Sequence, residues 1–183
     1  MTGSAVGEIV ADAEVDTAEI VDHGPPGQLS ERDQRFLRDV LGSFATGVTV
    51  ITTASLSGFA GFTVNSFTSV SLCPPLVLFC ADRNSATAAT IDQTKSFAVN
   101  ILGRDQEDIS RRFCESLRDR FEGVEVIKAT TGAPILREAL AYLDCELAGS
   151  VYAGDHQIFV GQVRSAAQLS DKDPLLFFQG DYC

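Results

Sequence analysis

Stretches rich in β-branched and aromatic residues follow one another along most of this chain, and turns separate most of them where an α/β protein would place helices. The predicted strands are residues 48–53, 61–72, 76–81, 97–102, 141–152, 156–168 and 175–178. Ala153-Gly154-Asp155, between the two longest, is a hairpin signal. Parallel strands need long crossover connections, and few are available here. We therefore expect an α+β fold, with an antiparallel barrel flanked by a few helices.

Three segments carry helical signals. Ser30 can cap the first helix, whose apolar face comprises Phe36, Leu37, Val40, Leu41 and Phe44. This helix is predicted to end near Thr46-Gly47, where glycine can adopt the left-handed cap. Asn84 or Ser85 can begin a short helix that runs to about residue 91, and residues 105–114 form the third. The following segment, up to Pro134, is predicted to be a loop.

Charge divides the chain into two parts. The 183 residues include 25 acidic and 14 basic side chains, a net charge of −11, yet residues 1–28 hold six of the acids and none of the bases. Gly24-Pro25-Pro26-Gly27 closes this stretch with residues that break helices. We expect residues 1–28 to be an acidic, disordered tail and residues 29–183 to be one domain. A docking arm for a partner is the alternative for the tail.

The acidic balance disfavours nucleic acid and anionic membranes as partners, since both require basic side chains. No apolar run approaches the roughly 18 residues of a membrane span, and the first residues lack the basic start of a secretory signal. The expected compartment is the cytoplasm. The five cysteines are irregularly spaced and the two histidines lie far apart, so we expect free thiols and no metal site.

Several catalytic motifs are absent from the sequence. It contains no G-x-G-x-x-G dinucleotide loop after a strand, no phosphate-binding P-loop and no G-x-S-x-G nucleophile elbow. A Ser-His-Asp triad would have to use His156, the only histidine of the predicted domain. Its neighbour Asp155 is expected to point to the other side of the strand, which disfavours a triad.

Three polar clusters remain as candidates. Residues 61–71 interleave hydroxyl and amide side chains with Phe and Val, which suits either an exposed strand or an uncharged surface that grips a planar polar ligand. Asn84-Ser85-Ala86-Thr87 is either a simple helix cap or a phosphate site at a helix start. Gly154-Asp155-His156 places a histidine at a hairpin, where it is either solvated or functional.

Motifs in the same order identify a family. Residues 44–52 read Phe-Ala-Thr-Gly-Val-Thr-Val-Ile-Thr, residues 61–71 read Gly-Phe-Thr-Val-Asn-Ser-Phe-Thr-Ser-Val-Ser, and Pro74-Pro75 follows. Ser85, Phe97-Ala-Val-Asn-Ile-Leu102, Asp119-Arg-Phe121, Gly154-Asp-His156 and Pro174-Leu-Leu-Phe-Phe-Gln-Gly180 complete the series. Over residues 30–182 the chain resembles the flavin reductase family. The resemblance implies a mainly antiparallel split β-barrel, as found in the small reductase partners of two-component flavin monooxygenases.

The resemblance also implies a set of site residues. The isoalloxazine and ribityl chain would be lined by Thr63, Val64, Asn65, Ser66, Phe67, Ser69 and Val70. The flavin phosphate would meet Asn84, Ser85 and Ala86, with Thr90 and Ile91 nearby and Arg120 and Phe121 as a further flavin-proximal pair. The nicotinamide nucleotide would face His156, Phe177, Phe178, Gln179 and Gly180. Val64 departs from the family, which often has alanine there.

The implied activity is that of an NAD(P)H:flavin oxidoreductase. Hydride passes directly from the nicotinamide to the flavin, so no catalytic acid, base or nucleophile is expected. The resemblance favours FAD over FMN, because the short-chain branch of the family often works with FAD. NADH is favoured over NADPH, because no Arg/Lys cluster near His156 offers a site for a 2′-phosphate. A homodimer is expected, with a separate monooxygenase or halogenase that receives the reduced flavin.

Two alternatives use the same barrel: a flavin-retaining oxidase and a non-catalytic flavin-binding protein. Gly154-Asp155-His156 together with the C-terminal Phe-Phe-Gln-Gly favours the reductase, because a carrier needs no nicotinamide site.

Overall fold

The computed structural model describes residues 29–115 and 119–183, so the predicted acidic tail lies outside the described residues. The chain separates into two units, of which the second is Gly42–Cys183, and each is described by itself. The first contains helix α1 (Glu31–Gly42). Ser30 caps it as predicted, since its hydroxyl oxygen accepts a hydrogen bond from the Asp33 amide at 3.2 Å.

The predicted end of this helix is wrong. α1 ends at Gly42, and Thr46–Gly47 forms a short strand, β1, that pairs with β11 (Leu176–Phe178) near the other end of the chain. Gly47 has no positive φ and so makes no left-handed cap. The sequence pattern could not reveal this ladder because its partner lies about 130 residues away, as the pairing of Thr46 with Phe177 shows.

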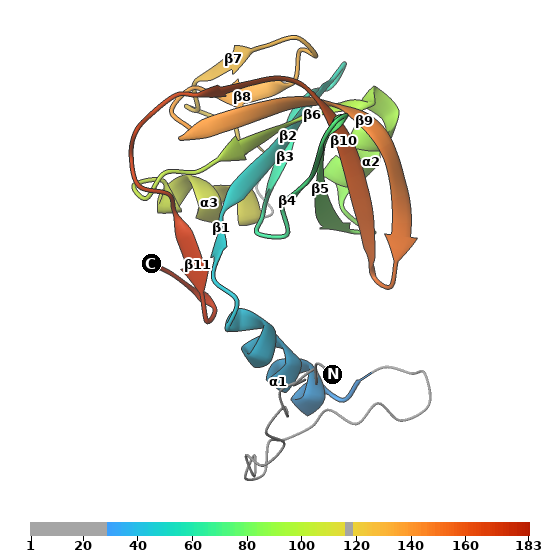
Figure 1. The fold of residues 1–183 in the computed structure, drawn as a ribbon, viewed down its shortest axis with the longest axis vertical. Helices are drawn as coiled ribbons and strands as arrows, with labels where there is room; N and C mark the ends of the chain where they lie inside the picture. Colours follow the sequence, from blue (N-terminus) through green and yellow to red (C-terminus); the bar gives the residue numbers. More distant parts are fainter. Residues whose placement is uncertain (1–28, 116–118) are drawn as a thin grey trace, which may run out of the picture. The chain divides into compact units, whose positions relative to one another are not determined.

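The second unit is built on a seven-stranded sheet in the order β3-β2-β6-β9-β10-β5-β4, and all its pairs are antiparallel (Figure 1). Its strands are β2 (Thr49–Ser55), β3 (Gly58–Val64), β4 (Thr68–Leu72), β5 (Pro75–Asp82), β6 (Ser96–Ile101), β9 (Ala141–Ala153) and β10 (His156–Gln168). The predicted α+β class and antiparallel sheet are confirmed. The long β9–β10 hairpin also forms where the Ala-Gly-Asp turn predicted it, with Gly154 at φ +62°.

The remaining elements are small. Helices α2 (Ala86–Thr94) and α3 (Glu107–Cys114) agree with the predicted helices, and Ser85, not Asn84, caps α2. β11 continues through a tight turn into β12 (Asp181–Tyr182). The predicted loop before Pro134 is wrong in part, because β7 (Val126–Lys128) pairs there with β8 (Pro134–Leu136).

The predicted strand over residues 61–72 is in fact two strands on opposite edges of the sheet. β3 ends at Val64, and β4 begins at Thr68. Ser66 fixes the link between them, since its hydroxyl donates to the carbonyl of Cys80 and accepts from the amide of Cys80, both at 3.0 Å. The Ser66 hydroxyl thus makes the two hydrogen bonds to Cys80 on β5 that the backbone of a neighbouring strand would otherwise make. Periodicity could not predict the break, because Thr, Val, Phe and Ser continue through it.

Aromatic rings fill the interior of the sheet. Phe79 stacks on Phe159 at 5.1 Å with their planes 5° apart, and meets Phe97 edge-on at the same distance. All three rings are fully buried. Gly161 leaves room for them, since a Cβ at this position would lie 2.3 Å from the Phe97 ring.

The five cysteines are free, as predicted. Cys145 is buried, and burial raises the pKa of its thiol from 9.0 to about 12, with the neighbouring Asp144 acting in the same direction. None of the helices in residues 29–115 and 119–183 is long and apolar enough to cross a membrane.

Candidate active site

A hollow of about 150 Å³ lies where the end of β3 meets the C-terminal strands. It is lined by Val48, Thr63, Val64, Asn65, Cys114, Phe177 and Tyr182, and we call it the β3 hollow. Three of these residues were predicted to bind the flavin, and Phe177 was predicted to face the nicotinamide. None of the lining side chains is an acid or a base of the Asp, Glu, Lys, Arg or His type.

Hydrogen bonds from three elements position the walls of the β3 hollow. The Thr63 hydroxyl on β3 donates to the Ser110 carbonyl of α3 at 2.7 Å. The hydroxyl groups of buried Ser110 and of Tyr182 on β12 lie 2.7 Å apart and share a hydrogen bond. The Arg111 guanidinium lies over the Tyr182 ring, 4.9 Å from its centroid. α3 therefore connects the predicted flavin strand to the C-terminal hairpin.

Tyr182 and Cys114 were not predicted. Tyr182 lies two residues after the Phe-Phe-Gln-Gly motif, and its closeness to that motif was the available signal. The β11–β12 turn depends on Gln179 and Gly180, which have φ of 49° and 86°. Among the predicted nicotinamide residues, Phe177 packs edge-on against Tyr182 at 5.3 Å, whereas Phe178 points to the other face of β11 and is exposed.

The rest of the predicted isoalloxazine set lies on the link and on β4. Phe67 packs against the main core, and Ser66 uses its hydroxyl on β5, as described above. Ser69 and Val70 are exposed on β4, where the register shifts. The structure thus brings Thr63, Val64 and Asn65 into one hollow and places the other four beyond its lining.

Arg120 and Phe121 have structural contacts in this chain. Arg120 donates to the carbonyls of Gly61 at 2.6 Å and Glu115 at 2.7 Å, which ties the segment after α3 to β3. Phe121 packs on Phe113 and Phe59, with ring centroids 5.0 and 5.5 Å away.

A second hollow, of about 410 Å³, lies at the start of α2 and is lined by Arg83, Asn84, Tyr152 and Asp155. We call it the α2 hollow. Ser85 accepts from the Ala88 amide, which leaves the Ala86 and Thr87 amides of the first turn for another acceptor. Thr90 bonds the Ala86 carbonyl of its own helix, and Ile91 is fully buried in the core. Neither side chain reaches this hollow.

His156 begins β10 beside the α2 hollow. The expectation that Asp155 points away from it is wrong: Asp155 lies in the turn before the strand, and its Oδ1 is 2.7 Å from His156 Nδ1. This hydrogen bond lowers the pKa of the Asp155 carboxyl. Figure 1 shows the β9–β10 turn and β11 well apart, so a single chain does not bring His156 to Phe177.

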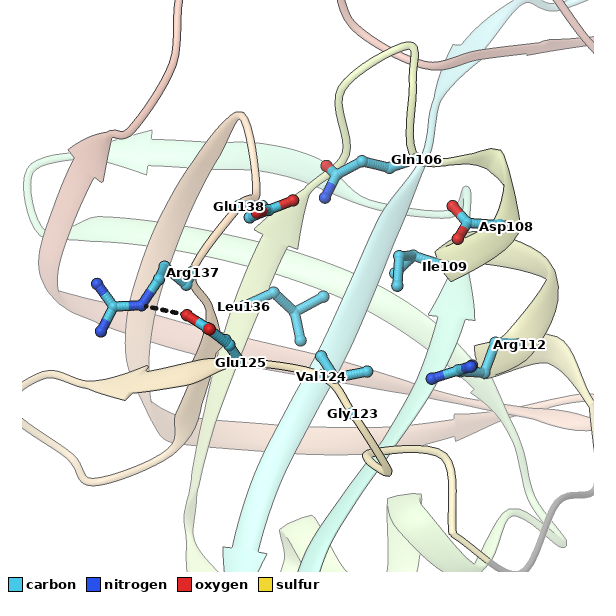
Figure 2. Close-up of a pocket in the computed structure, with 10 residues that line it drawn as sticks. All are labelled: Gln106, Asp108, Ile109, Arg112, Gly123, Val124, Glu125, Leu136, Arg137 and Glu138. Carbon is cyan, nitrogen blue, oxygen red and sulfur yellow. Dashed lines mark ion pairs between the residues drawn. The ribbon is translucent and has the colours of Figure 1, made fainter.

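A third pocket, of about 350 Å³, lies between α3 and the β7–β8 hairpin. Its floor is apolar, its rim is charged, and the Glu125–Arg137 ion pair at 3.0 Å lies on one side of it (Figure 2). It includes none of the predicted site residues. Within residues 29–115 and 119–183, no cluster of acidic, histidine and cysteine side chains could hold a metal ion.

The two hollows suit a flavin. The β3 hollow offers an uncharged surface for a planar ring, and the α2 hollow offers a guanidinium and free helix amides for phosphate. Ser66 lies between the two hollows in the chain of contacts. It follows Asn65, which lines the β3 hollow, and its hydroxyl bonds Cys80, which precedes Asn84 of the α2 hollow by four residues. β5 ends at Asp82, and Arg83 and Asn84 form the turn that leads to α2.

Known proteins share this sequence and fold. The family model of the flavin reductase like domain matches residues 41–183. The reductase subunit HsaB of a flavin-dependent monooxygenase from Rhodococcus jostii is 41% identical over 150 residues, covering 82% of this chain and 77% of the relative.

Two solved structures are also similar. The NADH:FAD oxidoreductase SgcE6 of Streptomyces globisporus, in complex with NAD and FAD fragments, has a TM-score of 0.79 and 37% identity, covering 86% of this chain and 95% of that one. BorF, the flavin reductase component of a bacterial two-component tryptophan halogenase, has a TM-score of 0.77 and 38% identity, covering 82% and 96%. The chain belongs to the flavin reductase family, as its motifs predicted, and is an NAD(P)H:flavin oxidoreductase.

Proposed function

We propose that this reductase oxidises NADH and reduces FAD, with the flavin ring in the β3 hollow. The observation that carries the proposal is that Thr63, Val64 and Asn65, predicted for the flavin, line the same hollow as Phe177, predicted for the nicotinamide. Hydride transfer requires the two rings to approach face to face, so their binding residues must converge. FMN and NADPH are the alternative substrates.

The protein's own part is binding and orientation. The bound flavin supplies the hydride acceptor, so the chain needs no acid, base or nucleophile at the reacting atoms. Thr63 donates a hydrogen bond to the Ser110 carbonyl, and Tyr182 shares one with the Ser110 hydroxyl. One residue of α3 therefore positions the β3 wall and the β12 wall of the hollow. The uncharged lining binds the ring by packing and hydrogen bonds without a covalent link, which suits a flavin that leaves after reduction.

The preference for NADH and FAD is supported by the relative named an NADH:FAD oxidoreductase. One basic side chain, that of Arg83, lies near His156, where the sequence predicts no Arg/Lys cluster. Arg83 lies beside this turn, where its Nη1 is 3.4 Å from the Gly154 carbonyl. It is a single guanidinium, already stacked on the Tyr152 ring, and one guanidinium does not make a basic cluster.

We further propose that the protein acts as a homodimer in the cytoplasm and delivers reduced flavin to a separate monooxygenase or halogenase. α1 supports the dimer, because it has an apolar face and none of its residues is buried. The relatives that serve a monooxygenase and a tryptophan halogenase support the transfer.

The test is NADH oxidation by flavin-free protein, with FAD, FMN or no flavin added. We expect turnover only with added flavin, many equivalents reduced per chain, and a higher kcat/KM for FAD and NADH than for FMN and NADPH. Turnover that stops after one equivalent of flavin, with free flavin in excess, would contradict release of the product.

A further inference from the structure

The pocket of about 350 Å³ between α3 and the β7–β8 hairpin, which we call the α3 pocket, shares no lining residue with the β3 hollow or the α2 hollow (Figure 2). Its floor consists of Ile109 on α3, Val124 in the loop that follows and Leu136 on β8. Leu136 is buried, and the other two side chains are half-buried. A pocket of this size with an apolar floor suits a small ligand that carries an aliphatic or aromatic group.

A buried hydrogen-bond donor faces the α3 pocket. Gln106 is 6% exposed, and its Oε1 accepts from the Gly103 amide at 2.9 Å. Figure 2 shows its side-chain amide directed into the pocket, and within residues 29–115 and 119–183 its Nε2 has no hydrogen-bond partner. Buried amide groups are normally hydrogen-bonded, so this nitrogen marks a place for an acceptor on a ligand.

Two opposite charges lie one helical turn apart on the α3 wall of the pocket. Asp108 and Arg112 both line it, yet neither makes an ion pair within the part of the chain that the structure describes. The neighbouring pair at the same spacing, Glu107 and Arg111, does pair at 2.7 Å. Arg112 is held by the Glu122 carbonyl at 2.7 Å, which uses one of its five donors. Both charges are therefore available to one ligand.

The other charged groups of the rim have partners. Arg137 pairs with Glu125 at 3.0 Å. The pKa of Lys172 is raised by its hydrogen bond to Asp105 and, more weakly, by the charge of Glu138, so Glu138 has a cation nearby. The groups left for a ligand are the two charges on α3 and the buried glutamine amide.

We infer that the α3 pocket binds a free amino acid with an apolar side chain of the size of leucine or phenylalanine. Its ammonium group pairs with Asp108, its carboxylate accepts from Arg112 and from Gln106 Nε2, and its side chain lies on the apolar floor. An α-amino acid carries both charges on one carbon, which suits two side chains whose Cα atoms are about 6 Å apart along a helix axis. A ligand with one charge leaves either Asp108 or Arg112 unpaired. The inference does not depend on the proposed function, because no residue assigned to the flavin or the nicotinamide takes part in it.

The first experiment is calorimetric titration of flavin-free, full-length protein with leucine and phenylalanine. At least one of them is expected to bind. 4-Methylpentanoate lacks the ammonium group of leucine, 3-methylbutylamine lacks its carboxylate, and glycine lacks the side chain. Each of these three should bind at least tenfold more weakly. Absence of binding by both amino acids, or equal affinity for a singly charged analogue, would overturn the inference.

The second experiment repeats the titration with charge variants of α3. Asp108→Asn and Arg112→Gln should each weaken binding about tenfold, the effect of losing one charged partner. Glu107→Gln is the control for the first, because it removes an acid from the same helical turn outside the pocket. Arg164→Gln is the control for the second, since this exposed arginine on β10 pairs with Glu146 at 2.6 Å. Both controls should bind like wild type, and equal losses in a variant and its control would contradict the assignment.

Gln106→Glu tests the buried amide. The new side chain keeps an acceptor for the Gly103 amide but turns a carboxylate toward the carboxylate of the ligand, so binding should weaken by more than tenfold. Its melting temperature is measured in parallel, and if the variant does not fold, the two variants on α3 decide the case. Saturating FAD or NADH should leave the affinity for the amino acid unchanged. Competition by either cofactor would overturn the inference of a separate site.

Discussion

A shared hydroxyl contact near the C-terminal end of the chain sets the shape of the β3 hollow. Tyr182 reaches Ser110 at 2.7 Å, and the carbonyl of the same serine holds Thr63. One residue of α3 thus fixes a wall predicted for the flavin and a wall that carries Phe177. The Tyr182 ring lines part of the hollow, and its hydroxyl holds that ring in one orientation through the bond to Ser110.

Tyr182→Phe separates these two contributions. The ring remains, but the hydrogen bond is lost, which costs about 0.5 to 1.5 kcal/mol. We expect a several-fold lower kcat for flavin reduction with a smaller change in flavin KM, since the rings still bind but are less well aligned. Stopped-flow measurement of hydride transfer at saturating NADH checks this. If Tyr182 only stabilises the fold, Tyr182→Phe would lower the melting temperature and leave the rate of hydride transfer unchanged.

Cys145 gives a pH dependence of stability that can be measured. Its thiol has a pKa of about 12 in the folded chain against 9.0 for the unperturbed group, so the folded state retains a proton that the unfolded state loses between these values. The free energy of unfolding should therefore fall as the pH rises from about 9 to about 12. Cys145→Ala should show a shallower decline in denaturant titrations over this range. Equal slopes for the two proteins would contradict the assignment.

A buried asparagine helps to hold the β7–β8 hairpin to the main sheet. The amide nitrogen of Asn100 donates to the Val50 carbonyl at 2.9 Å and to the Thr52 hydroxyl at 3.0 Å, and its carbonyl accepts from the Leu136 amide at 2.8 Å. Asn100 is fully buried and connects β6, β2 and β8. The Thr52 hydroxyl also bonds the Pro134 carbonyl, and Ile135 packs against Ala98 in a buried cluster, so Asn100 acts together with these contacts.

Asn100→Ala should cost about 3 kcal/mol, because it leaves the Leu136 amide buried without a partner and removes the bonds to Val50 and Thr52. For a chain of this size the melting temperature should fall by roughly 6 to 12 °C. Gln93→Ala, which removes an exposed amide from α2, is the control and should change it by less than about 2 °C. Matching losses in both variants would show that Asn100 has no special role.

The elements that the sequence could predict are those that carry their own periodicity or turn residues. β2, β5, β6, β9, β10, α2 and α3 are of this kind. β1, β7 and β12 have two or three residues each, too few to show a periodicity, and each exists because another segment pairs with it: a distant one for β1 and the next strand in a hairpin for β7 and β12. The same limit applies to the site. Motifs identified Thr63, Val64, Asn65 and Phe177, but the stack of Arg83 on Tyr152 joins residues 69 positions apart that no local pattern relates.

The acidic residues 1–28 dominate the charge of the full chain. Without them the net charge changes from −11 to −5, since six of the 25 acids and none of the 14 bases are removed. Ordering these residues would cost about 1 to 2 kcal/mol each in backbone entropy, and their like charges repel one another, so we expect them to contribute little to the fold.

Deletion of residues 1–28 should therefore leave kcat/KM for flavin reduction within about twofold and the melting temperature nearly unchanged. Sedimentation of the truncated protein at several concentrations should give the same homodimer as the full chain. A shift to monomer, or a large loss of activity, would show that these residues take part in assembly.

The order of the seven-stranded sheet has a chemical consequence at its two ends. β3 and β4 are consecutive in sequence but form opposite edges, and within this sheet each pairs with one strand only. Of the residues predicted to line the isoalloxazine, Thr63 and Val64 lie on one edge strand and Ser69 and Val70 on the other. An edge strand presents backbone amides and carbonyls that no neighbouring strand of the sheet pairs. A ring with hydrogen-bonding edges can use such groups as an added strand would. Under the proposed function, the flavin would bind beside these edges and outside the aromatic core, so the core would stay packed each time the reduced flavin leaves.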